Sequence, residues 1–457
     1  MLDIESLKNR FRAKKKALET ELKEFIAFQT ISADPDYLPH FGACAAWLEK
    51  KLISMGAHVE IWNKEGRPII FAALSSKKED APTLLLYNHY DVQPVDPLDE
   101  WKSDPFAATI EGETIRGRGV SDDKGQCLFV LSALEEFVQK GLPCNIKFLF
   151  EGEEETASTT LIQYCETKKE ALQADYSMVI DLGMRERGIA AIPIGTRGVT
   201  ALSLTLHGIN QDLHSGTYGG LAPNPLQAIS SLLATLHNAD GSVAVPGFYD
   251  GVRTLSDKER SELSLSMNEE KWENDFGQPP VGGEQAFSPL ERAGVRPTLE
   301  INGISGGYTG AGIKTVIPRE AKAKISCRLV ADQKPEEIAE KVRSFLLEKT
   351  PKGTTLDVEI LEGKGEAYRA RTESPVFLAV EKAMEMVWGK RPEKMAEGGS
   401  IPIIPVLQEA SQSDLVCWGV TLPSDRIHAP NENISFEQLE QGFLTLSLAI
   451  EFLGASE

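Results

Sequence analysis

Apolar residues near the N-terminus recur at the spacing of an amphipathic helix. They lie within residues 1–31, at Leu7, Phe11, Leu18, Leu22, Phe25 and Ile26. Lysine and glutamate occupy many of the positions between them. Because side chains three, four or seven residues apart share one face of an α-helix, this pattern predicts a helix that lies across the first hydrophobic core.

Short runs rich in leucine, isoleucine and valine follow this helix and alternate with a second helical pattern. The runs cover residues 68–74, 83–87, 146–150 and 176–180. The helical pattern consists of Cys127, Leu128, Leu131, Leu134 and Val138. Strands that alternate with helices are typical of a mixed, largely parallel sheet flanked by helices, so an α/β fold is predicted.

From Gly198 the pattern changes to that of a sheet with one face in water. Leu202, Leu204 and Leu206 alternate with more polar residues, as in a half-exposed strand. A helix, two strands, a further helix and a last strand follow, at residues 226–236, 298–304, 321–330, 335–349 and 356–361. This β-α-β-β-α-β order predicts a ferredoxin-like α+β domain. Residues 240–295, rich in glycine, serine and glutamate, are interpreted as an insertion within it.

The α/β pattern returns after Tyr368. A helix is predicted from Ser374-Pro375 to Trp388, then a strand near residues 414–420 and a final helix from Ser435. The simplest architecture is one α/β domain that a smaller domain interrupts. The α/β domain is expected to comprise residues 1–197 and 369–457, and the inserted domain residues 198–368.

Composition and charge narrow the classes of partner. The 457 residues are 41% hydrophobic and 25% charged, which is ordinary for a folded globular protein. With 48 basic and 68 acidic residues the formal charge is −20, so nucleic acid and membrane surfaces are not expected as partners.

No apolar run approaches the ~20 residues of a membrane span, and residues 1–16 lack the apolar core of a signal peptide. Six scattered cysteines are typical of reduced, mostly buried thiols, so a cytoplasmic protein is expected.

Histidine and acidic residues occupy strand ends and turns, where open α/β sheets place their functional sites. They are His89, Asp91, Asp122, the triplet Glu153-Glu154-Glu155, Asp181 and His428. Taken singly, each is more often structural. Together they have the composition of a site for two divalent cations about 3.5 to 4 Å apart. On a strand His89 and Asp91 face the same side, so Asp91 is placed to bind the second ring nitrogen of a metal-bound His89.

Five motifs along the chain carry a family resemblance. They are Asn88 to Pro94, Gly117 to Gly125, Glu151 to Ser158, Asp212 to Gly216 and Arg426 to Glu432. Their order resembles that of the dinuclear-zinc metallopeptidase family that contains carnosinase, aminoacylase, succinyl-diaminopimelate desuccinylase and glutamate carboxypeptidase. The resemblance covers essentially the whole chain and is strongest to the carnosinase-like cytosolic dipeptidases. It implies that the inserted domain is a lid and dimerisation domain.

The resemblance also implies a cofactor of two divalent metal ions in each subunit. Asp122 would bridge the two ions, His89 and Asp181 would complete one, and Glu155 and His428 would complete the other. Histidine and carboxylate ligands suit Zn²⁺, while carboxylate-rich pairs also accept Mn²⁺ or Co²⁺.

Glu154 is implied as the general base. A water shared by two cations is acidified toward neutrality, so Glu154 would take its proton, the hydroxide would attack the substrate carbonyl, and Glu154 would return the proton to the leaving amine. The family usually has glycine where this chain has Ala157. Ser158 and Glu151 nevertheless favour Glu154 as the base over the register one residue earlier. Asp123 is not expected to be a ligand, because the family varies at this position.

His214, in the Asp-Leu-His-Ser-Gly motif, is implied as a catalytic residue. It would stabilise the tetrahedral oxyanion from the partner subunit's inserted domain, so a homodimer through that domain is expected. A domain that covers a site suggests closure on the substrate, which excludes water. The alternative for His214 is a structural histidine in a glycine-rich turn.

Three glycine-containing loops, at residues 195–198, 307–314 and 397–402, are interpreted as facing the substrate. The candidate substrate-binding residues are Arg197, Arg328, Gly399 and Ser400. Arg328 lies on the strand face opposite the apolar residues of its strand, so it points away from the domain core and could bind a substrate carboxylate through two hydrogen bonds. A surface ion pair is the alternative.

These features favour an enzyme that hydrolyses the peptide bond of dipeptides or similar short substrates with a free C-terminal carboxylate. An N-acyl-amino-acid amidohydrolase, which would break an equivalent amide with the same metals, is an alternative. A non-catalytic binding protein on the same fold is a third, against which the retained Glu154 argues. The sequence leaves side-chain preference, the identity of the metal and the role of residues 240–295 open.

Overall fold

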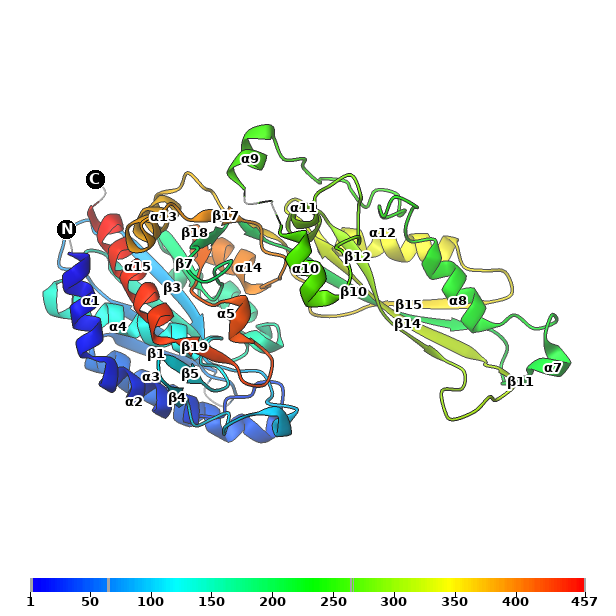
Figure 1. Cartoon of the computed structure of the whole chain (residues 1–457), viewed down its shortest axis with the longest axis horizontal. Coiled ribbons are helices and arrows are strands. Elements are labelled where there is room, and N and C mark those ends of the chain that lie inside the picture. Colours follow the sequence, from blue (N-terminus) through cyan, green and yellow to red (C-terminus); the bar gives the residue numbers. More distant parts are fainter. Residues whose placement is uncertain (1–2, 64–65, 264, 266, 456–457) are drawn as a thin grey trace. The chain divides into compact units, whose positions relative to one another are not determined.

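The computed structural model describes residues 3–63, 66–263, 265 and 267–455, and the chain divides into two compact units (Figure 1). Unit 1 comprises Met1–Ile194, Ala370–Met395 and Ile403–Glu457, and unit 2 comprises Gly195–Arg369 and Ala396–Pro402. Residues 396–402 group with unit 2, although the linear pattern places them in the second part of the α/β domain. The domain boundaries expected after residues 197 and 368 stay a prediction.

A six-stranded, mostly parallel sheet is the core of unit 1. In order across the sheet its strands are β1 (His58–Trp62), β2 (Ile69–Leu74), β6 (Asn145–Glu151), β3 (Thr83–His89), β7 (Tyr176–Ile180) and β18 (Asp414–Trp418). The pairings among β6, β3, β7 and β18 are parallel, whereas β1–β2 and β2–β6 are antiparallel. The predicted largely parallel sheet is confirmed. The edge strand β1 escaped prediction because most of its residues are only half-buried and no apolar run marks it.

The N-terminal region forms two helices rather than the single predicted one. α1 (Ile4–Ala13) ends before Lys14, whose N–H donates to Arg10 O at 3.3 Å and to Phe11 O at 3.0 Å, and α2 (Lys15–Ala27) begins directly after it. α2 ends at Ala27, because the backbone at Phe28 is extended. The six predicted core positions are confirmed, since each is at most 4% exposed. Residues 1 and 2 lie outside the described part of the chain.

The other helices of unit 1 pack in two groups, except the first of them, which packs against β1 and β2. They are α3 (Leu38–Ser54), α4 (Lys124–Lys140), α5 (Thr159–Thr167), α6 (Lys169–Leu172), α13 (Pro375–Trp388), α14 (Ile403–Ser411) and α15 (Phe436–Ala455). α15 packs against α1, α4 and α13, and α14 packs against α5 and α6. The predicted helix start at Ser374 is confirmed, because Ser374 Oγ accepts a hydrogen bond from the Phe377 N–H at 3.4 Å. Smaller sheets are formed by β4 (Thr109–Glu111), β5 (Thr114–Arg116) and β19 (Asn433–Ser435), and by β8 (Ala191–Pro193) with β17 (Glu393–Met395).

Unit 2 is built on a four-stranded antiparallel sheet. In order its strands are β12 (Thr298–Gly306), β14 (Glu320–Leu329), β10 (Gly198–His207) and β15 (Thr355–Ile360). Along β10 buried and half-exposed residues alternate strictly, as predicted. α8 (Pro225–Ala234) and α12 (Pro335–Glu348) share one hydrophobic cluster with the sheet. The predicted ferredoxin-like order is therefore confirmed. Short pairs are β9 (Gly195–Thr196) with β16 (Tyr368–Arg369) and β11 (Leu213–His214) with β13 (Val316–Ile317), and α7 (Ser215–Tyr218) follows β11.

The segment from 240 to 295 contributes to the core of unit 2. Val243, Val245 and Phe248 are buried in the same cluster as the sheet. Three short helices follow, α9 (Asp257–Glu262), α10 (Glu269–Phe276) and α11 (Pro289–Gly294). Helices this short show fewer than three turns of periodicity, which is why the hydrophobic pattern left the segment unassigned.

The six cysteines are all buried, as expected, and in the described part of the chain none is disulfide-bonded. Among the described helices, none combines the length and the apolarity that crossing a membrane requires.

Candidate metal centre

Four predicted site residues lie at the carboxyl ends of adjacent strands in unit 1. His89 is the last residue of β3, Asp181 directly follows β7, and Glu154 and Glu155 begin the short 3-10 helix η3 (Glu154–Thr156) that follows β6. β6, β3 and β7 are neighbours and parallel, so their carboxyl ends meet at one edge of the sheet. The fold thus brings together residues that are up to 92 positions apart.

Two loops complete the cluster. Asp122 precedes α4, and His428 lies between the 3-10 helix η4 (Pro423–Asp425) and β19. Asp122 Oδ1 is 2.9 Å from His89 Nε2, and its Oδ2 is 3.0 Å from His428 Nε2. A carboxylate that meets a different imidazole with each oxygen has the arrangement of a bridging ligand.

The possible ligand atoms fall into two groups, and within each group the atoms lie within 4.8 Å of one another. The groups are His89, Asp123 and Asp181, and Asp122, Glu155 and His428. His89 Nε2 is 3.2 Å from Asp181 Oδ1, and His428 Nε2 is 3.3 Å from Glu155 Oε2. Imidazole nitrogens and carboxylate oxygens are donors for Zn²⁺, Mn²⁺ and Co²⁺, so the residues present fit a pair of divalent cations.

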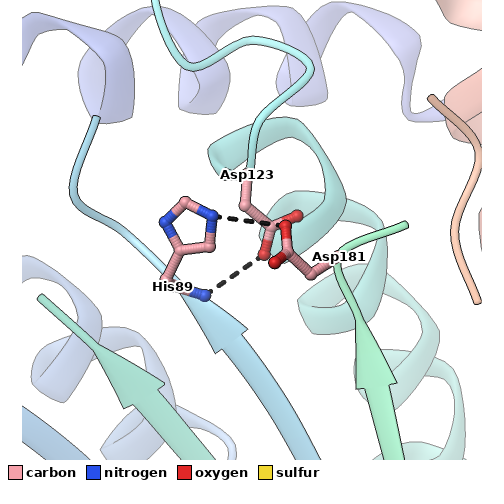
Figure 2. Close-up of side chains that lie close together, drawn as sticks. All are labelled: His89, Asp123 and Asp181. Atoms are coloured by element: carbon pink, nitrogen blue, oxygen red, sulfur yellow. Dashed lines mark hydrogen bonds and ion pairs between the residues drawn. The ribbon is translucent and has the colours of Figure 1, made fainter. Parts of the chain in front are cut away.

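Asp123 lies closer to the cluster than the sequence suggests. Figure 2 shows it beside His89 and Asp181. Its Oδ2 accepts hydrogen bonds from the His89 N–H at 3.2 Å and from Asn88 Nδ2 at 2.8 Å. Its Oδ1 is buried and has no hydrogen-bond partner among the described residues. Asp123 therefore fixes the end of β3, and its exclusion from the ligand set stays a prediction.

Asp91 joins His89 to the turn that carries the glutamates. Its Oδ1 is 3.3 Å from His89 Nδ1, the ring nitrogen that does not face Asp122. The same carboxylate accepts the backbone N–H of Glu154 at Oδ1 and that of Glu155 at Oδ2, each at 3.1 Å. The sequence suggested the contact with the histidine only. A single buried side chain thus orients an imidazole and anchors the neighbouring turn.

The two imidazoles are held by carboxylates that favour their protonated form. Hydrogen bonds with Asp122 and Glu155 raise the pKa of His428 to about 10. Burial lowers the pKa of His89, but the charge of Asp181 and the hydrogen bonds to Asp122 and Asp181 raise it well above its ordinary value. A cation bound by the same nitrogens would displace these protons, so cation binding should weaken as the pH falls.

The carboxylates of the cluster differ in their affinity for protons. Burial would raise the pKa of Asp122, but hydrogen bonds from His428 and His89 keep it well below its ordinary value. Burial raises the pKa of Glu154 well above its ordinary value. The charge of His89 lowers this pKa, and the charge of Asp181 raises it further. A buried glutamate that binds a proton readily can both take and return one.

The glutamates of the triplet make different contacts, and the register in which Glu154 is the base stays a prediction. Glu153 Oε2 accepts the Thr160 N–H at 2.9 Å, and Glu153 Oε1 lies 3.6 Å from Arg67. Glu155, in contrast, accepts a hydrogen bond at Oε2 from Gln93 Nε2 at 2.7 Å and belongs to the ligand group of His428. Gln93 was missed as a contact of this site, although it lies within the motif Asn88 to Pro94.

The predicted substrate-binding residues lie together in unit 2. Arg328 Nη1 donates to Ser400 Oγ at 2.8 Å, and the Arg197 N–H donates to Gly399 O at 2.9 Å. Arg197 Nε donates to Gly398 O at 2.9 Å. Burial and the nearby charge of Arg328 lower the pKa of Arg197 to about 10. Within the described chain neither guanidinium has a salt-bridge partner, so the two cations carry charge that an anion can neutralise.

His214 lies in unit 2 at the end of β11 and is exposed. Its Nδ1 accepts a hydrogen bond from the Gly216 N–H at 3.0 Å. In a neutral imidazole whose Nδ1 is an acceptor, Nε2 carries the hydrogen and is free to donate. Nε2 lies 3.5 Å from Thr315 Oγ1. The ring can therefore act as a hydrogen-bond donor.

The fold and the paired ligand groups are those of a metallopeptidase. Residues 85–451 match the model of peptidase family M20/M25/M40, and the chain belongs to this family. It is thus an enzyme of the metallopeptidase class, as the motifs predicted.

Relatives with assigned names are similar over nearly their whole length. The chain is 30% identical to the human Beta-Ala-His dipeptidase over 437 residues, 91% of this chain and 85% of that protein. It is 27% identical to the Cys-Gly metallodipeptidase dug1 of Schizosaccharomyces pombe over 453 residues, 94% of each chain. A solved structure of an M20 family metallo-carboxypeptidase, Sso-CP2 from Sulfolobus solfataricus, superposes with a TM-score of 0.85 and 30% identity, covering 96% of this chain and 99% of the other.

Proposed function

We propose that this metallopeptidase hydrolyses the peptide bond of dipeptides, or of similarly short substrates with a free C-terminal carboxylate. The observation that carries the proposal is Asp122, whose two oxygens meet the imidazoles of His89 and His428 at 2.9 and 3.0 Å. The names of the human and the Schizosaccharomyces pombe relatives, both dipeptidases, support the substrate class.

The proposed ligand set is the one inferred from the motifs. Asp122 bridges the two positions, with His89 and Asp181 at one and Glu155 and His428 at the other. When bound, two divalent cations would acidify a shared water and polarise the substrate carbonyl. Zn²⁺ is the proposed ion, because imidazole and carboxylate are its usual nitrogen and oxygen donors.

Glu154 is proposed as the proton carrier of the reaction. Its carboxylate takes a proton from the attacking water as the new C–O bond forms, and returns it to the amine nitrogen as the C–N bond breaks. Its burial and its raised pKa support both steps. Asp91 holds the second nitrogen of His89, which keeps the ring oriented, and holds the turn that presents Glu154.

Arg328 and Arg197 are proposed to bind the C-terminal carboxylate of the substrate, with Gly399 and Ser400 as the loop that positions them. Both guanidiniums donate to the loop at residues 398–400 and have no salt-bridge partner in the described chain, which supports an anionic ligand. Charged hydrogen bonds to a carboxylate would select peptides with a free C-terminus over their amides.

A substrate panel tests this function. The enzyme should turn over free dipeptides, and a dipeptide amide should be a poor substrate. Arg328→Ala should raise KM for the free dipeptide about 10- to 100-fold, since a charged hydrogen bond contributes about 1.5–3 kcal/mol. Lys324→Ala, which removes an exposed cation from the same strand β14, is the matched control and should leave KM unchanged.

The alternative is an N-acyl-amino-acid amidohydrolase, because the same ligand groups would cleave an equivalent amide. N-acetyl and N-succinyl amino acids belong in the panel for this reason, and a tripeptide tests the carboxypeptidase activity that the name of Sso-CP2 suggests. Turnover of acyl amino acids alone would contradict the dipeptidase proposal. A non-catalytic binding protein is set aside, because the chain belongs to an enzyme family and retains Glu154.

His214 is proposed to donate Nε2–H to the tetrahedral oxyanion of the partner subunit's active site, in a homodimer formed through unit 2. The edge strand β12 supports such an interface, because among the described residues no strand pairs with its outer side, and Ile301 and Ile304 on it are 42% and 51% exposed.

Mixing two inactive variants tests the shared site. In a mixed dimer of His214→Ala and Glu154→Gln chains, one site contains both an intact Glu154 and an intact His214. Equimolar chains that exchange at random should therefore recover about one quarter of the wild-type rate. Each variant incubated alone is the control. No recovery after exchange has been verified with tagged chains would contradict sharing.

A further inference from the structure

The carboxylate of Glu432 is fully buried and lies against the loop that presents Asp122. Its Oε1 accepts the backbone N–H of Ser121 at 2.9 Å and that of Asp122 at 3.1 Å. Its Oε2 accepts the backbone N–H of Gly119 at 2.9 Å. The loop can turn its N–H groups inward in this way because Gly119 adopts a φ of 82°, which favours glycine.

Arg118 supplies the opposite charge and links a third segment. Its Nη1 donates to Glu432 Oε2 at 2.8 Å, and its Nη2 donates to Pro94 O at 2.9 Å. Pro94 follows Gln93, the residue that donates to Glu155. Arg118 is 1% exposed, so the charges of Arg118 and Glu432 are stabilised by each other and not by water.

The contacts of Glu432 and Arg118 connect the two loops that carry the ligands Asp122 and His428. Glu432 lies four residues after His428 and precedes β19, which fixes its position by pairing with β5. His89 and Asp181, in contrast, are held at the ends of β3 and β7 by the sheet itself. The distance between Asp122 and His428 therefore depends on the clamp formed by Glu432 and Arg118.

We propose that Glu432 is a positioning residue for the metal position formed by Asp122, Glu155 and His428. The inference rests on the proposed metal centre and extends it to a residue that contacts no ion. Glutamine at this position would present an amide NH₂ to N–H donors on one side, so two of the four hydrogen bonds to the carboxylate would be lost. The loop that carries Asp122 should then relax, and Asp122 and His428 should no longer be held at the distance that suits one ion.

Zinc titration of chelator-treated, full-length protein tests this inference, with a competing chelator in calorimetry to resolve tight binding. Wild type should bind two Zn²⁺ ions. In Glu432→Gln the ion at the position of Glu155 and His428 should bind about 10- to 100-fold more weakly, the usual effect of losing a residue that supports a ligand. The other ion should be affected less, because the sheet still holds His89 and Asp181 and only the shared ligand Asp122 shifts. Glu440→Gln is the matched control, because Glu440 is also buried and paired with an arginine, Arg12, and its hydrogen bonds within the described chain do not reach the metal ligands.

The outcomes separate the two proposals. Two wild-type affinities in Glu432→Gln would overturn the positioning role alone. A wild-type protein that binds no zinc would overturn the metal centre and this inference with it. If Glu432→Gln does not fold, Arg118→Lys replaces it, since lysine keeps the charge but cannot reach both Glu432 and Pro94 with one planar group. The same weakening of one ion is then expected, and its absence would overturn the role.

Discussion

Glu154→Gln should lower kcat for a dipeptide by about 10²- to 10⁴-fold, the usual contribution of a general acid–base group. Glutamine has nearly the same shape, so the backbone hydrogen bond from residue 154 to Asp91 should persist and hold the turn. Metal content should therefore stay near that of wild type. Steady-state kinetics and metal analysis of the same preparation provide the measurement.

Glu153→Gln is the matched control for this experiment and also tests the register of the triplet. Glu153 accepts the Thr160 N–H and lies 3.6 Å from Arg67, outside both ligand groups. Its replacement should leave kcat within a few-fold of wild type. A large loss of kcat in Glu153→Gln, with near-normal kcat in Glu154→Gln, would identify Glu153 as the general base.

Asp122→Ala should have the largest effect on the metal centre. Both imidazoles lose the carboxylate that lies between them, so both positions lose a ligand in one substitution. We expect metal content to fall from about two ions to below one, and kcat/KM to fall by more than about 10³-fold, because several kcal/mol of stabilisation of the reacting carbonyl and water would be lost.

Asp99→Ala serves as its control. Asp99 is an exposed carboxylate of unit 1, in the short 3-10 helix η2 (Leu98–Glu100). Plasma emission spectrometry of the dialysed proteins reports metal content directly. Retention of two ions and of activity in Asp122→Ala would contradict the bridging role and, with it, the paired ligand groups on which the proposed reaction depends.

The hydrophobic pattern was sufficient to predict most of the fold. The strands of the large sheet that are buried on both faces stand out as apolar runs, and β10 of unit 2 stands out by strict alternation. The failures have physical causes. β1 is half-buried at a sheet edge, and the break at Lys14 depends on local backbone hydrogen bonds that leave the apolar spacing intact.

The ligand residues could be proposed from the sequence because each lies at a strand end or in a recognisable turn. Their supporting contacts could not. Gln93 is 62 residues from Glu155, and Glu432 is 310 residues from Asp122, so no local pattern connects either pair. Strand geometry predicts Asp91 beside His89, but no sequence pattern indicates its hydrogen bonds to the next turn.

The side chain of His89 is fully buried, whereas that of His428 is 53% exposed. Solvent and small chelating molecules therefore reach the two halves of the cluster unequally. A preparation washed with dilute chelator is expected to become a mixture of fully and half-loaded molecules before it becomes empty. Specific activities measured on such material would depend on how much metal each preparation has lost as well as on the enzyme itself.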